Sequence, residues 1–191
     1  ESIGVVGGEA AASLLIESEE HAQCRGANVL ARIISYASCF VASGAMRKAK
    51  RSSTLESGER GSAEAIQLAI SRALADAGLE PQQLGLVVCH GMGDPVMDLN
   101  ERTALSAAVP GAPVVATIAS LGHCGAASAM VDLVTGALAL SKRQVPPTLR
   151  REQTTMEIGF RDVPEALQKD HVLCLSHTAE GSATATVLAT A

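Results

Sequence analysis

Aromatic side chains and positive charge are both scarce in this sequence. Its 191 residues include no Trp, one Tyr and two Phe, which leaves little with which to stack on nucleobases. Lys and Arg number 15 against 20 Asp and Glu, for a net charge of −5. Nucleic-acid binding depends on cationic side chains that neutralise phosphates, so we expect no nucleic-acid partner.

Long apolar runs are missing as well. No stretch of 18 or more apolar residues is present, so we expect no segment that spans a membrane. No basic segment is followed by a short apolar one, so we expect no signal peptide. The cysteines are odd in number and scattered, mostly in apolar runs: Cys24, Cys39, Cys89, Cys124 and Cys174. This usage disfavours a disulfide framework and a zinc motif, and it favours a reducing cytoplasm.

The composition that remains is that of a globular domain. Hydrophobic residues make up 47% of the chain and charged residues 18%, enough for one domain with its own core over 1–191. The chain begins with Glu1 rather than Met and enters a strand-like run within three residues. This start suggests a piece of a longer protein.

The hydrophobic pattern alternates between strands and helices. Strands are expected at 3–17 (with a glycine break), 28–40, 84–89, 113–117, 172–176 and 183–189. Helices are expected at 18–25, 63–77, 99–108 and 123–141, the second between an N-cap Ser62 and a terminating Gly78. A polar loop is expected at 41–61. This alternation predicts parallel βαβ units with helices on both faces of an α/β sheet.

Two histidines follow strands, where sites form in α/β folds. His90 comes directly after the strand 84–89, and His123 follows the strand 113–117 through a short loop. Two converging imidazoles could donate hydrogen bonds to a developing enolate or oxyanion. The alternative is that each histidine only caps an element or fills a polar corner.

Neighbouring residues allow other interpretations. Cys89 and His90 point to opposite faces of a strand, so they cannot bind one metal ion together, and no metal site is predicted. Cys89 is a weak candidate nucleophile because burial raises the pKa of a thiol. Asp98 and Glu101 suit the N-terminus of a helix, where carboxylates are favourable.

Two further polar features have open interpretations. Asp132, in the middle of the apolar helix, is expected to face solvent or a partner chain. The basic cluster in the loop 41–61 is either solvated or a docking place for an acidic carrier protein; it consists of Arg47, Lys48, Lys50 and Arg51.

Several motifs resemble those of one family. They are GVVGGEAAASLLIESEEHAQCRGA at 4–27, ALADAGLEP at 73–81, HGMGDPVMDLNE at 90–101, GHCGAAS at 122–128 and VPPT at 145–148. In order and spacing they resemble the C-terminal half of a β-ketoacyl-acyl-carrier-protein synthase, a condensing enzyme of the thiolase superfamily. The resemblance runs over most of the chain.

The resemblance implies a fold and a reaction. The fold is a layered α-β-α-β-α arrangement in which two similar halves pack together, commonly as a homo- or heterodimer. The reaction is a decarboxylative Claisen condensation of acyl and malonyl thioesters in fatty-acid or polyketide synthesis. His90 and His123 match the family's catalytic histidines, which polarise the malonyl thioester and stabilise the enolate.

The resemblance also implies what else the reaction needs. The nucleophilic cysteine belongs to the N-terminal half, and no cysteine here matches it. No dissociable cofactor is implied, because the substrate is carried on the phosphopantetheine of an acyl carrier protein. That carrier and the N-terminal half, or a partner subunit, are therefore the expected partners.

The chain departs from the family pattern around the site. Met92 and Asp94 replace two threonines that contact the pantetheine arm, and a carboxylate at 94 would repel an enolate. Ile118 replaces a lysine, although its partner Glu101 is kept. His177 and Ala179 replace the gate phenylalanines. We therefore expect Met92, Asp94 and His177 to contact substrate, and Asp98 and Glu101 to support the site.

Three functions fit these features. The first is a divergent synthase whose other half supplies the cysteine. The second is a non-catalytic subunit of the chain-length-factor type that pairs with an active synthase. The third is a thiolase-superfamily enzyme with a different substrate.

Overall fold

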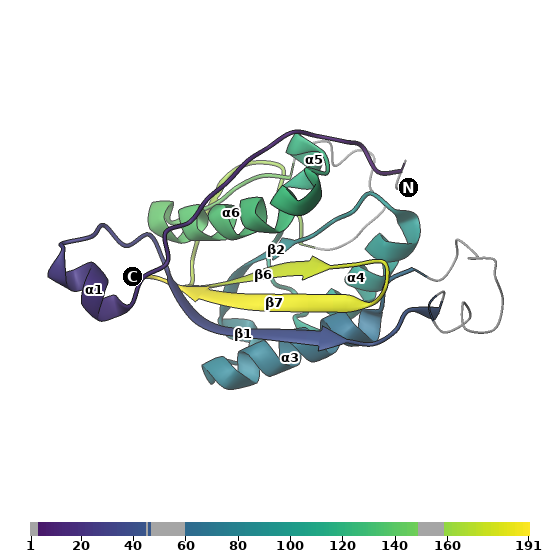
Figure 1. Cartoon of the computed structure of the whole chain (residues 1–191), viewed down its shortest axis with the longest axis horizontal. Coiled ribbons are helices and arrows are strands. Elements are labelled where there is room, and N and C mark those ends of the chain that lie inside the picture. Colours follow the sequence, from purple (N-terminus) through teal and green to yellow (C-terminus); the bar gives the residue numbers. More distant parts are fainter. Residues whose placement is uncertain (1–3, 45, 47–59, 149–158) are drawn as a thin grey trace.

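A five-stranded mixed sheet organises the chain. The computed structural model describes residues 4–44, 46, 60–148 and 159–191 (Figure 1). The strand order is β1-β7-β6-β2-β3. The bounds are Arg32–Phe40 for β1, Leu84–Cys89 for β2, Val114–Ala116 for β3, His171–His177 for β6 and Ser182–Ala189 for β7. A separate antiparallel pair joins β4 (Gln144–Val145) to β5 (Glu165–Ala166).

The sheet is only partly parallel, which corrects the expectation of parallel βαβ units throughout. β2 pairs in parallel with β3 and with β6, whereas β7 pairs antiparallel with both β6 and β1. The reason is the tight connection between β6 and β7. The Thr178 amide donates to the Ser182 carbonyl at 2.9 Å, and so short a turn can only reverse the chain.

Helices cover both faces of the sheet. Helices α3 (Ala63–Ala77) and α4 (Pro95–Ala108) lie on one face, and α6 (Ser128–Lys142) lies on the other (Figure 1). Ile66 and Ile70 of α3 are fully buried against the first face. Leu140 of α6 packs with Val172 on the second. The result is one three-layered α/β/α unit, with the expected helices on both sides.

The ends of α3 are those that the sequence predicts. The Ser62 hydroxyl accepts the Ala65 amide at 3.1 Å, and Gly78 ends the helix in the left-handed conformation with φ of 65°. The short helix α1 (Glu19–Cys24) is also confirmed.

Two other helices start elsewhere than expected. α4 begins at Pro95 rather than near residue 99, because Asp94 caps it and proline suits a first helical position. The helix predicted from His123 begins only at Ser128. Gly122 and Gly125, with φ of 78° and 60°, separate α6 from the preceding short helix α5 (Ile118–Leu121), and a 3₁₀ turn η2 (Gly125–Ala127) stands where the predicted helix was to begin.

The N-terminal segment forms no extended strand among its described residues 4–17. It runs across the molecule and makes a single bridge between Gly7 and His123 (Figure 1). It also leaves large apolar side chains exposed, among them Val5, Val6, Leu15 and Ile16. Of the predicted loop 41–61, the basic cluster lies outside the described residues. No helix in the described ranges is long and apolar enough to cross a membrane.

Candidate functional site

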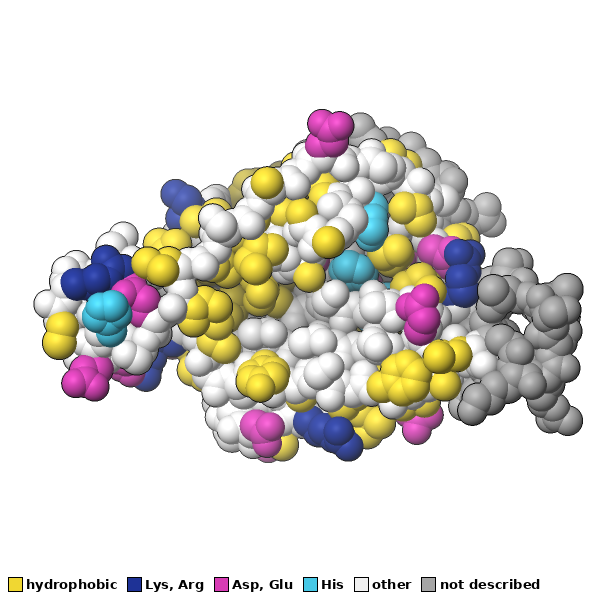
Figure 2. All heavy atoms as spheres, viewed as in Figure 1, with side chains coloured by type: hydrophobic (Ala, Val, Ile, Leu, Met, Phe, Trp, Pro, Cys, Tyr) yellow, Lys and Arg dark blue, Asp and Glu magenta, His cyan; other side chains and the backbone are white. Residues whose placement is uncertain are grey.

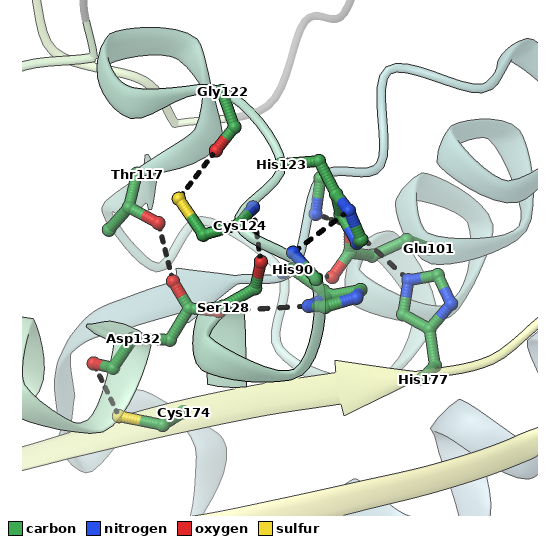
Figure 3. A network of polar contacts seen from close by, with 12 residues as sticks. His90, Glu101, Thr117, Gly122, His123, Cys124, Ser128, Asp132, Cys174 and His177 are labelled. Atoms are coloured by element: carbon green, nitrogen blue, oxygen red, sulfur yellow. Dashed lines mark hydrogen bonds and ion pairs between the residues drawn. The ribbon is translucent and has the colours of Figure 1, made fainter. Parts of the chain in front are cut away.

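Three histidines meet at the carboxyl ends of the parallel strands. His90 follows β2 directly, His177 ends the neighbouring β6, and His123 lies on the loop after α5. The ring centroid of His90 is 6.1 Å from that of His123 and 5.2 Å from that of His177, both edge-on (Figure 3). Parallel pairing of β2 with β6 places His90 and His177 at the same edge of the sheet. The sequence thus led to a real cluster, and the structure brings His177 into it.

His90 is paired with a buried carboxylate of α6. Its Nδ1 lies 3.6 Å from Oδ2 of Asp132, which is only 1% exposed. The Thr117 hydroxyl donates to the other carboxylate oxygen of Asp132 at 2.5 Å. The expectation that Asp132 faces solvent or a partner chain is therefore wrong. An acidic residue can be buried in an apolar helix when such partners are available.

Opposing effects set the pKa values of this pair. Burial alone would lower the pKa of His90, but the carboxylates of Asp132, Glu101 and Asp98 together raise it. Burial raises the pKa of Asp132, and its contacts with His90 and Thr117 only partly offset that. The raised pKa of His90 favours the protonated form of its ring.

Glu101 holds the backbone that carries His90. Its two carboxylate oxygens accept the amides of His90 at 2.7 Å and Gly91 at 2.9 Å. Glu101 is 3% exposed, and burial would raise its pKa. His177, the Gly91 amide and His90 outweigh burial and lower that pKa to about 2. Glu101 is therefore ionised and is not a helix cap, contrary to the capping expectation; Asp98 is buried in the first turn of α4.

His123 is held by the N-terminal segment and by its own loop. Its amide donates to the Val6 carbonyl at 2.7 Å, and its carbonyl accepts the Gly8 amide at 3.0 Å. The Gly125 amide donates to Nδ1 of the His123 ring at 3.3 Å. Because Nδ1 accepts, the neutral ring carries its proton on Nε2. His123 therefore offers one N–H group away from its loop.

Met92 and Asp94, which stand where the family pattern has threonines, lie between β2 and α4. Met92 is partly exposed in that loop. Oδ1 of Asp94 accepts the amides of Val96 and Met97 at 3.1 Å, and Oδ2 pairs with Arg60 at 2.5 Å. Helix α4 and Arg60 thus occupy both oxygens of Asp94.

The described cysteines do not supply a nucleophile facing this cluster. Burial raises the pKa of the Cys89 thiol, and the carboxylates of Glu101, Asp132 and Asp98 raise it further. Burial also raises the pKa of Cys174. Cys124 points its thiol at the Gly122 carbonyl, 3.4 Å away and away from His90 (Figure 3). Within the described residues, no three His, Cys, Asp or Glu side chains are placed to hold a metal ion.

The cluster reaches the molecular surface. His123 is partly exposed, whereas His90 and His177 are buried. In Figure 2, histidine side chains lie in a hollow near the middle of one face, beside apolar side chains. The arrangement can donate hydrogen bonds from fixed imidazoles to an oxygen that enters from this face.

Sequence reasoning named Glu101 as a support of the site but not the groups that it contacts, and it missed the pairing of Asp132 with His90. The role of Glu101 depends on where the loop after β2 folds back, and no local pattern records that. Asp132 did carry a signal, since a single carboxylate in the helix SAMVDLVTGALALSK needs a buried partner or an exposed face.

Fold and site together define an α/β protein with paired histidines at the carboxyl edge of a mixed sheet, in a thiolase-like fold. Residues 39–152 match the family described as Beta-ketoacyl synthase, C-terminal domain. The chain belongs to this family.

Relatives and solved structures agree with this assignment. The chain is 38% identical over 159 residues to 3-oxoacyl-[acyl-carrier-protein] synthase 2 of Mycobacterium bovis, covering 82% of this chain and 36% of the relative. It is 33% identical over 169 residues to the synthase of that name from Staphylococcus aureus, covering 86% and 38%. A solved structure of the ishigamide ketosynthase/chain length factor superposes with a TM-score of 0.83 at 24% identity, covering 98% of this chain and 45% of that one. The chain thus spans less than half the length of each of these proteins.

Proposed function

We propose that this chain is the C-terminal half of a divergent 3-oxoacyl-acyl-carrier-protein synthase. The reaction is the decarboxylative Claisen condensation of an acyl thioester with a malonyl thioester. The observation that carries the proposal is the convergence of His90 and His123, whose ring centroids lie 6.1 Å apart at the carboxyl edge of the sheet.

Both histidines can donate a hydrogen bond to the enolate that the reaction forms. Loss of CO₂ from a malonyl thioester leaves an enolate, and its oxygen needs hydrogen-bond donors. His123 donates through Nε2, because Nδ1 already accepts the Gly125 amide. His90 has Nδ1 directed at Asp132 and a raised pKa, so its protonated ring can donate through Nε2 as well.

The acyl group must be held by a residue outside this chain. Burial keeps Cys89 and Cys174 as thiols, and Cys124 directs its thiol to the Gly122 carbonyl. We place the nucleophilic cysteine in an N-terminal half, either in the same polypeptide or in a partner subunit. The enolate attacks the acyl thioester formed there, and the cysteine thiolate leaves.

The expected partners follow from this reaction and from the surface. The acyl and malonyl groups arrive on the phosphopantetheine of an acyl carrier protein, so the chain itself needs no metal or dissociable cofactor. The exposed apolar side chains of the N-terminal segment and of β1 offer an area for the other half or for a dimer partner; on β1 they are Ile33, Ile34, Tyr36 and Phe40. All five cysteines are free, which fits the expected cytoplasm.

A second function is favoured by one observation. Ile118 supplies no amine to Glu101, and the partner of that carboxylate is His177 instead. A site altered in this way fits a non-catalytic subunit of the chain-length-factor type, which pairs with an active synthase. The superposed ishigamide ketosynthase/chain length factor is named for such a pair.

Malonyl decarboxylation in the full-length protein separates the two functions. His123→Ala removes one enolate donor, so the rate should fall by about 10²–10³. His171→Ala, at the far end of β6, is the matched control and should keep the parental rate. Decarboxylation at the parental rate in His123→Ala would contradict the role of His123.

Acylation tests the nucleophile separately. The intact mass of the native protein is measured after incubation with an acyl donor. An increase of one acyl group supports the synthase. If neither the protein nor a bound partner gains the group, the non-catalytic subunit becomes the function.

A further inference from the structure

Glu101 is a buried, charged carboxylate that needs a cationic partner. It is 3% exposed, ionised, and the only described link between α4 and the backbone amides of His90 and Gly91. Two neutral amides do not cancel a full charge in a dry environment, where an uncompensated ion is costly. Among the described residues, no Lys or Arg pairs with Glu101.

His177 is the group in position to supply that cation. Its Nε2 lies 3.6 Å from Oε2 of Glu101, and its side chain is 2% exposed. Neither ring nitrogen of His177 has a hydrogen-bond partner among the described residues. A buried imidazole without hydrogen bonds is itself unfavourable, unless an ionic contact stabilises it.

We propose that protonated His177 is a positioning residue, which fixes the carboxylate of Glu101 and, through it, the loop that presents His90. The chain of contacts is short. β6 carries His177, Glu101 of α4 lies next to it, and the amides of His90 and Gly91 donate to the two oxygens of Glu101 (Figure 3).

Losing the cation has a definite consequence for the loop. An unpaired Glu101 either takes up a proton, which blocks one acceptor oxygen, or moves toward water. Either change weakens the bonds to the His90 and Gly91 amides. The effect on catalysis rests on the proposed function: a displaced His90 should lower kcat for malonyl decarboxylation while leaving KM nearly unchanged.

The structure offers a second place from which a cation can reach Glu101. A Cβ atom built on Gly91 would lie 3.3 Å from Cγ2 of Ile118, so the Ile118 side chain borders the residue whose amide Glu101 accepts. A lysine at 118 therefore starts beside the carboxylate. Replacing His177 on β6 and introducing a lysine at position 118 on α5 therefore moves the cation while leaving Glu101 unchanged.

The test is hydrogen exchange at the His90 and Gly91 amides of the full-length protein. His177→Phe keeps a ring of similar size and removes the charge, and exchange at these amides should become about tenfold faster. Ile118→Lys combined with His177→Phe should bring exchange back to within about twofold of the parent. His171→Phe, on the same strand, should leave both amides as protected as in the parent.

A charge-dependent effect also requires Glu101. In a Glu101→Gln background, His177→Phe should add no further exchange. Unchanged exchange in His177→Phe overturns the proposal. So does faster exchange that neither Ile118→Lys repairs nor Glu101→Gln suppresses, because His177 would then act by packing alone. Exchange needs no substrate, so an inactive protein with the expected exchange pattern would contradict only the proposed function.

Discussion

His90 Nδ1 and Asp132 Oδ2 lie 3.6 Å apart, and neither atom has a hydrogen-bond partner among the described residues. The distance is slightly beyond a hydrogen bond, so the pair acts through charge rather than through a shared proton. Asp132 is anchored on its other oxygen by Thr117. A carboxylate fixed in this way favours the imidazolium of His90 and orients its ring.

Asp132→Asn removes this charge while keeping the side-chain shape. The pKa of His90 should fall, which an NMR titration of its ring proton measures directly. On the proposed function, malonyl decarboxylation by the full-length protein should fall by about 10- to 100-fold, the range seen for carboxylates that orient metal-ligating histidines.

The same variant changes the pH dependence of stability. A raised folded pKa means that protonation of His90 stabilises the protein below its ordinary pKa of 6.5, and that this stability is lost as pH rises through the higher folded value. Asp132→Asn should flatten this dependence. Asp170→Asn, at an exposed pair with Arg143, is the control that should not. An unchanged His90 titration in Asp132→Asn would refute the pairing.

Glu101→Gln should alter acid stability in the opposite sense. The pKa of Glu101 falls from 4.5 to about 2 on folding, so ionised Glu101 contributes stability above pH 4.5 that is lost as pH falls toward 2. The drop corresponds to roughly 3 kcal/mol. Urea unfolding of the parent and the variant should show a gap in the free energy of unfolding that narrows as pH falls from 4.5 to 2.

A surface carboxylate provides the control for that experiment. Glu165 pairs with Arg161 at the surface, and Glu165→Gln should leave the acid curve close to the parental one. A gap between the parent and Glu101→Gln that does not narrow in acid would mean that Glu101 acts through shape and not through charge.

Much of the framework follows from local sequence signals. Ser62 and Gly78 fix the ends of α3, and the apolar run 84–89 gives β2 with His90 just beyond it. Two histidines after successive strands predicted a common site, because the carboxyl ends of parallel strands share an edge. The resemblance then placed His177 at the same wall, and the structure puts its ring 5.2 Å from that of His90.

The rest depends on contacts between distant residues. The direction of β7 is set by the tight turn after β6 and not by its alternation, which is the same for either direction. Glu101 reaches the loop after β2 only because α4 folds back across it. The pairing of Asp132 with His90 joins residues far apart in the chain, and helical periodicity alone cannot choose between a buried partner and solvent.

Asp94 should matter more for helix α4 than for substrate charge. Asp94→Ala removes the N-cap and the partner of Arg60, and it should lower the free energy of unfolding by about 1–2 kcal/mol. Asp94→Asn keeps a capping oxygen and should cost less than about 1 kcal/mol. Thermal unfolding of the two variants measures the difference. Equal losses would mean that the cap contributes nothing and that the charge paired with Arg60 dominates.

Gly136 should be intolerant of a methyl group, although it lies within a helix. Alanine favours a helix over glycine by about 1 kcal/mol. At Gly136, however, a Cβ would lie 2.6 Å from Sγ of Cys174 and 3.1 Å from Leu188, both buried on the sheet beneath α6. Overpacking of this kind costs about 1–3 kcal/mol, so Gly136→Ala should be destabilising on balance in urea unfolding.

Cys174→Ala removes the sulfur atom that a methyl group at position 136 would approach too closely. Combined with Gly136→Ala, it removes the sulfur in the way, so the double variant should be more stable than the sum of the two single losses predicts. Ser141→Ala, exposed on the same helix, should change stability by less than about 0.5 kcal/mol. Strict additivity would show that the loss in Gly136→Ala does not come from the close approach to Sγ of Cys174.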